Sequence, residues 1–121
     1  MKQDLNSKAE NFVKSKYLSR KEYDDYSFKD NYFFIKGGEK HKKIFLTSEL
    51  SKKEGYDSDV ICLSNRENAE WIIKNWEKLI NKENTFFFLG SHYWALNPKN
   101  HNKIIERKNL RKSVMTLLEN N

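Results

Sequence analysis

The sequence predicts a single α/β domain over residues 1–121, with helices and strands mixed along the chain and a small mixed sheet of about five strands. Two apolar runs, Val60–Leu63 and Phe86–Leu89, flank one amphipathic stretch, which is the pattern of a βαβ unit. Aromatic and β-branched runs precede this unit, and amphipathic stretches lie toward both ends of the chain. The expected order of elements is therefore αβββαββα, with the helices packed on the sheet.

The first half of the chain is expected to hold one helix and one hairpin. Between residues 4 and 18 the apolar positions recur at spacings of three, four and one, the stripe of an amphipathic helix. Residues 20–30 are rich in charge and tyrosine, and they fit either a loop or an irregular edge strand. Tyr32–Lys36 and Lys43–Thr47 are β-rich and enclose two glycines, so they predict a hairpin with a loop of about five residues.

The βαβ unit is the clearest local signal in the chain. Val60–Leu63 is apolar without alternation, which is typical of a strand covered on both faces. Ser64 and Glu67 have the spacing of a capping box, and the residues that follow place their apolar side chains on one face of a helix over about 66–81. Phe86–Leu89 then predicts a second covered strand, parallel to the first.

The last part of the chain is expected to add a strand and a helix. Gly90 and Ser91 fit a tight hairpin turn into a strand over 92–96, which Asn97 and Pro98 end. An apolar stripe over 110–118 predicts the final helix, with Asn109 as its N-cap.

Composition limits the cellular setting. Hydrophobic residues make up 37% of the chain and charged residues 33%, which is too apolar for a disordered protein and too polar for a membrane protein. A bilayer span needs about 20 apolar residues and a secretory segment about 7 to 15, so neither is expected here. The one cysteine, Cys62, lies in an apolar run and excludes an internal disulfide. We therefore expect a cytoplasmic protein with Cys62 in its core.

The distribution of charge is more informative than its total. The formal net charge is +6, but the excess of Lys and Asn is typical of an A/T-rich genome. The charge concentrates in residues 31–56, with 6 basic and 3 acidic side chains, and in residues 99–121, with 6 and 2. Cations in the first turn of the final helix oppose its dipole at a cost of about 0.3 to 1 kcal/mol each, which a bound polyanion would relieve.

This pairing of basic and aromatic residues predicts a small nucleic-acid-binding domain, non-catalytic or weakly catalytic and of low sequence specificity. Lysines would follow the phosphates while aromatic rings stack on bases, provided that the two basic clusters share one side of the fold. The candidate residues are Lys40, Lys42 and Lys43 at the hairpin tip, Tyr93 and Trp94 in the last strand, and Lys99, Lys103, Arg107, Lys108, Arg111 and Lys112 toward the C-terminus.

A protein partner is the first alternative. Trp71, Tyr93 and Trp94 would then anchor an accessory or immunity-like module, since aromatic residues with scattered charge are typical of interface cores. Trp71 favours this interpretation because it lies off the apolar stripe of its helix. No cofactor and no metal are expected: nucleotide-binding, zinc-protease and esterase motifs are absent, and the histidine spacings match no metal-ligand pattern.

A small nuclease is the second alternative. Up to the fourth strand the expected order of elements is similar to the restriction-endonuclease-like core, which implies an Asp and a Glu-x-Lys on the early strands holding Mg²⁺. The early strands contain no Glu-x-Lys; the one such tripeptide is Glu106–Lys108, and the closest upstream aspartate is Asp59. Metal-free RNA cleavage would instead need His92 and His101 to converge near Lys99, Lys103 and Arg107.

Overall fold

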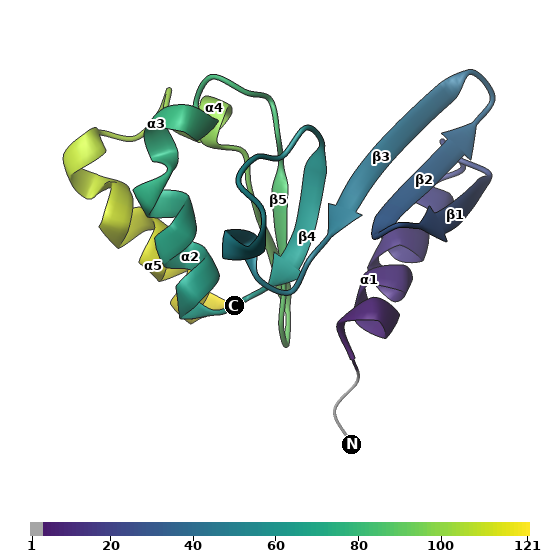
Figure 1. Ribbon diagram of the computed structural model, residues 1–121, viewed down its shortest axis with the longest axis horizontal. Coiled ribbons are helices and arrows are strands. Elements are labelled where there is room, and N and C mark those ends of the chain that lie inside the picture. The colour runs from purple at the N-terminus through teal and green to yellow at the C-terminus, as the bar shows by residue number, and fades with distance from the viewer. Residues whose placement is uncertain (1–3) are drawn as a thin grey trace.

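A computed structural model describes residues 4–121 and shows a mixed six-stranded sheet with helices on both faces (Figure 1). The strands are β1 (Asp25–Lys29), β2 (Tyr32–Gly37), β3 (Lys40–Leu46), β4 (Asp59–Leu63), β5 (Phe86–Leu89) and β6 (Tyr93–Leu96). The α-helices of this range are α1 (Leu5–Val13), α2 (Arg66–Lys74), α3 (Trp76–Leu79), α4 (Pro98–His101) and α5 (Leu110–Asn120). The predicted mixed α/β fold is confirmed, with one strand more than expected.

The strands lie side by side in sequence order. Strands β1, β2 and β3 pair antiparallel, β3, β4 and β5 pair parallel, and β6 returns antiparallel to β5. The parallel pair of β4 and β5 is joined through α2 and α3, so the predicted βαβ unit is confirmed. The additional strand is β1, formed from the segment whose state the sequence left open, and it makes one edge of the sheet.

Helices cover the two faces unequally. Helix α1 packs on one face, while α2 and α5 pack on the other (Figure 1). Strand β4 shows why its run lacks alternation, because Ile61 packs toward α1 whereas Val60 and Cys62 pack toward α2 and α5. Cys62 is fully buried, and burial raises the pKa of its thiol well above the ordinary value. Within residues 4–121 no helix is both long and apolar enough to cross a membrane.

The helix expected over 66–81 differs from the structure at both its start and its middle. Asn65, rather than Ser64, is the N-cap, and its side chain accepts a hydrogen bond from the Asn68 amide. Ser64 accepts instead from the indole of Trp94, over 2.8 Å, so the predicted capping box is wrong. At Asn75 the backbone leaves helical geometry (φ −102, ψ 14) and separates α2 from α3.

Two connections between elements differ from what the sequence predicts. Strands β2 and β3 extend to the pair Gly37 and Lys40, so the predicted five-residue hairpin loop is wrong, and the lysines expected at its tip belong to β3. Gly38 supplies the positive φ of 61° that this turn needs. After β6, Pro98 opens the short helix α4, whose N-cap Asn97 accepts from the amide of Asn100.

Gly37 occupies a position where the chain crosses itself closely. A Cβ atom at Gly37 would overlap the backbone oxygen of Glu22 and lie 2.6 Å from the Cα of Tyr23. Both contacts are with backbone, which cannot rotate aside as a flexible side chain would. We expect Gly37→Ala to lower the free energy of unfolding by about 1 to 3 kcal/mol, measured by urea denaturation. Gly55→Ala is the matched control, because a Cβ there meets nothing within 4 Å.

Candidate functional site

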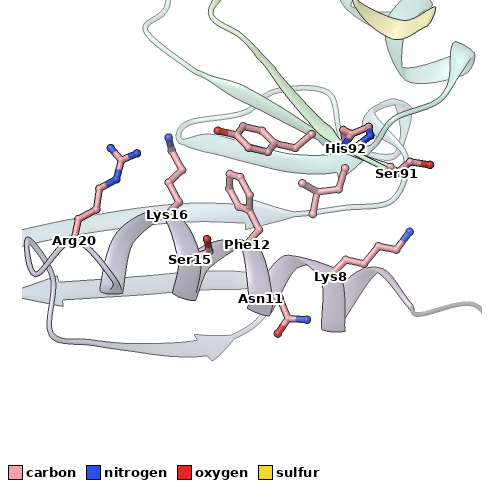
Figure 2. A pocket seen from close by; sticks show the side chains of 11 residues that line it. Lys8, Asn11, Phe12, Ser15, Lys16, Arg20, Ser91 and His92 are labelled. Atoms are coloured by element: carbon pink, nitrogen blue, oxygen red, sulfur yellow. The ribbon is translucent and has the colours of Figure 1, made fainter. Parts of the chain in front are cut away.

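A groove of about 800 Å³ lies between the N-terminal helical segment and the turn that joins β5 to β6 (Figure 2). One wall is α1 together with the π-helical turn Lys14–Leu18 that continues it, and the other wall is formed by residues 89–93. The helix is anchored on the sheet by the buried side chains of Ala9, Val13 and Tyr17. Its other face is therefore free to present side chains to the groove.

The apolar part of the groove is aromatic. The ring of Phe12 lies 5.0 Å from the ring of Phe87 and 5.0 Å from that of Tyr93, measured between centroids. Tyr93 is 52% exposed, because it lies on the edge strand β6 and points to the face where α1 covers the sheet only in part. An exposed ring held in place by a second ring is a surface on which a flat apolar group can stack.

The polar part of the groove is positively charged. Lys8, Lys16 and Arg20 line it from one side of the helical segment, with Lys8 at one end and Arg20 at the other (Figure 2). Among the described residues, none of the three forms an ion pair, and no Asp or Glu lines the groove. The Lys16 ammonium lies 5.4 Å from the ring centroid of Phe87, a cation–π contact that holds it above the sheet. Because no Asp or Glu of the described residues lines the groove, the positive field of the three cations is not cancelled there by carboxylates.

The C-terminal cations identified in the sequence have a different environment. Arg111 forms two hydrogen bonds, of 2.5 and 2.8 Å, with the Glu70 carboxylate of α2, and these bonds hold the pKa of Glu70 below its ordinary value. Ion pairs also join Arg107 to Glu77, Lys99 to Glu83 and Lys108 to Glu106. Carboxylates of the preceding helices thus offset the cations at the start of α5, and a polyanion would meet these carboxylates as well.

The hairpin cations are also paired in part. Lys42 lies 2.8 Å from Asp59, and Lys43 lies 3.5 Å from Asp57. Lys40, and likewise Lys103 and Lys112 near the C-terminus, form no ion pair within residues 4–121. The β2–β3 turn and α5 lie toward opposite ends of the long axis of the molecule (Figure 1), so the segments that carry the two basic clusters are far apart in the fold.

The three predicted aromatic anchors lie in three different environments. Trp94 is 3% exposed and stacks on Phe88, with 3.9 Å between ring centroids, so neither of its faces is available to a base or a partner. Trp71 is half-buried on the α2 side, edge-on to Tyr56 at 5.6 Å. Tyr93 lies on the opposite face of the sheet, in the groove. A protein partner for Trp71 or Tyr93 stays a prediction, but the three residues do not form one anchor surface.

The residues of the nuclease alternative are also separated. His92 lines the groove at the start of β6, whereas His101 lies beyond the other end of this strand, 3.1 Å from the Ser113 hydroxyl. Burial lowers the pKa of His101 and favours its neutral form. Glu106 pairs with Lys108 next to the 3-10 turn before α5 and is not part of the sheet. In the part of the chain that the structure describes, no three His, Cys, Asp or Glu side chains are placed to hold a metal ion.

Sequence reasoning missed the helical wall of the groove. Lys8, Phe12, Lys16 and Arg20 recur at every fourth position, which places them along one side of a helix. This spacing is present in the sequence. It is inconspicuous because Phe12 also fits the apolar stripe predicted between residues 4 and 18, and because carboxylates on other faces of the helix reduce the net charge of the segment.

The groove is lined by three kinds of chemical group. It offers cations for an anionic group, hydroxyls of Ser15 and Ser91 for hydrogen bonds, and an aromatic surface for a flat ring. No match was found for this chain in comparisons with protein-family models, with curated proteins and with solved structures. The geometry of the groove is therefore the basis for assigning a function.

Proposed function

We propose that this protein binds single-stranded nucleic acid in the groove between α1 and the β5–β6 turn, without reading its sequence. The observation that carries the proposal is the combination, in one groove, of an exposed aromatic ring with three cations that form no ion pair within residues 4–121, where no carboxylate of these residues lines the groove. Cationic grooves with aromatic platforms are the usual means of holding a single strand.

A single strand suits the groove better than a duplex. The bases of a duplex are stacked on one another and are not available to a ring such as Tyr93, whereas unpaired bases can turn outward and stack. The ammonium groups of Lys8 and Lys16 are point charges that attract phosphate but do not distinguish bases. We therefore expect little dependence on sequence and a clear preference for unpaired strands.

The dimensions of the groove suit a short segment. Lys8 lies in α1, and Arg20 follows the π-helical turn that continues it, so the two are closer than about 18 Å, the length that twelve residues of α-helix would span. A stacked strand advances about 3.4 Å per nucleotide, so this wall spans about five nucleotides or fewer. With three cations in contact with phosphates, the plot of log affinity against log salt concentration should have a slope of about −2 for a single strand.

The first test is fluorescence anisotropy with labelled single-stranded and duplex oligonucleotides at two salt concentrations. We expect the single strand to bind more tightly than the duplex and to weaken with salt at the slope given above. No binding of the single strand even at low salt would overturn the proposal.

Tyr93 tests the aromatic part of the groove. We expect Tyr93→Ala to lower the affinity for a single strand by about 5- to 150-fold, because stacking of one base contributes roughly 1 to 3 kcal/mol. Tyr93→Phe keeps the ring and should bind like the wild type in the same anisotropy assay. Equal losses in both variants would show that the ring does not act as a stacking surface.

A further inference from the structure

The edge strand β1 exposes backbone groups that a further strand can bind. Strands β1 and β2 are joined by the two-residue turn of Asp30 and Asn31, whose φ values are 54° and 68°. This turn makes Lys29 and Tyr32 a hydrogen-bonded pair, and alternation along the strand then directs the N–H and C=O groups of Tyr26 and Phe28 away from β2. In the single chain the Tyr26 N–H donates to the side chain of Asp25, over 2.8 Å, rather than to β2, and pairing with a further strand would replace this hydrogen bond.

The side chains of β1 are complementary to a second copy of the same strand. When two copies run antiparallel about Ser27, Asp25 of each lies opposite Lys29 of the other, and Tyr26 lies opposite Phe28. Opposite charges and aromatic pairs are both favourable across neighbouring strands. We propose that β1 pairs with β1 of a second copy across a two-fold axis at Ser27, which joins two six-stranded sheets into one.

The environment of these side chains agrees with such a pairing. Phe28 is 41% exposed although its ring lies 4.6 Å from that of Phe33, so a neighbouring strand would cover apolar surface that water now contacts. By the alternation of the strand, Asp25 and Lys29 point to the face of the sheet opposite that of Phe28. Neither forms an ion pair within the described residues. Charges on an edge strand oppose pairing with most other strands, and here they favour one register of self-pairing.

The two-fold axis of an antiparallel strand pair is perpendicular to the sheet, so both copies would carry α1 on the same face. The two grooves would then also lie on one face of the joined sheet. The pairing itself rests on β1 alone and does not depend on what the groove binds. A five-residue strand buries little area, so we expect a weak dimer that forms at high protein concentration.

Charge reversal tests the proposal by sedimentation equilibrium at protein concentrations up to about 1 mM, a range suited to a small interface. We expect the wild type to dimerise, and Asp25→Lys and Lys29→Asp each to raise the dimer dissociation constant by about tenfold or more, because two attractions become two repulsions. An equal mixture of the two single variants, and the double variant alone, should both recover the dimer, since opposite charges then face each other again. A monomeric wild type, or a dimer unaffected by the single changes, would overturn the proposal.

A crosslink tests the register. The Cα atoms of the two Ser27 residues would be about 4.5 Å apart as a pair without backbone hydrogen bonds, which is within the range of a disulfide. Ser27→Cys should therefore form a covalent dimer under mild oxidation, detected on a non-reducing gel, whereas Ser51→Cys, an exposed control, should not. The native Cys62 is buried and should not contribute. Absence of a crosslink at Ser27 under conditions where the wild type dimerises would refute this register.

Discussion

Replacing Lys8, Lys16 and Arg20 together by Gln is expected to lower the affinity for a single-stranded oligonucleotide by about a hundredfold or more at about 50 mM salt. Each cation that contacts a phosphate releases counterions on binding, so losing three contacts should also bring the salt slope from about −2 to near zero. Fluorescence anisotropy over a series of salt concentrations measures both quantities. All three side chains lie at the surface of the groove, so the melting temperature should change little.

The matched control removes the same number of charges elsewhere. Lys99, Arg107 and Arg111 each pair with a carboxylate, and replacing all three by Gln changes the net charge of the protein by the same amount. We expect this control to retain most of the affinity and the salt slope of the wild type. A loss as large as that of the groove variant would mean that total charge or the C-terminal cluster, rather than the groove, governs binding.

Asn68→Ala is expected to lower the free energy of unfolding by about 3 kcal/mol or more. Asn68 is 1% exposed, and its side chain accepts from the Leu50 amide and donates to the carbonyls of Ser48 and Leu63, over 2.8 to 2.9 Å. The truncation leaves these three backbone groups without their partner, and each unpaired buried group costs about 1 to 3 kcal/mol. Urea denaturation followed by circular dichroism gives the free energy directly.

Asn81→Ala controls for the change of residue type. Asn81 is exposed and its side chain donates one hydrogen bond, to a carbonyl of the same helical segment. We expect this variant to lie within about 0.5 kcal/mol of the wild type. If Asn68→Ala also changed the free energy of unfolding by less than about 0.5 kcal/mol, the hydrogen bonds of the Asn68 side chain would not be what holds the start of α2 against the loop before β4.

The fold was predictable where the signal is local. The covered strands β4 and β5 follow from their uninterrupted apolar runs, and the helix between them and the amphipathic ends of the chain follow from helical periodicity. The break at Asn75, the N-cap at Asn65 and the short helix α4 were not predicted, because each depends on which of several polar side chains reaches a given backbone group. The sequence of β1 fits a loop as well as an edge strand because charge interrupts its pattern, which is also why β1 can stand at the edge of the sheet.

The candidate site was harder to predict than the fold. The C-terminal cations were conspicuous in the sequence, but the carboxylates that pair with Arg107 and Arg111 are 30 and 41 residues away and are brought close only by tertiary packing. Trp94 looked like a stacking surface, whereas its place between Phe88 and Ser64 depends on the pairing of β5 with β6. The groove combines two segments about 80 positions apart, and no local pattern connects them.

The most direct test of the groove is to follow the backbone amide resonances of isotope-labelled protein by NMR while an unlabelled single-stranded oligonucleotide is added. The proposal predicts that the resonances that shift most belong to residues 8–20 and 89–93, with those of residues 99–112 nearly unchanged. Shifts concentrated in residues 99–112 with the helical wall unaffected would contradict it.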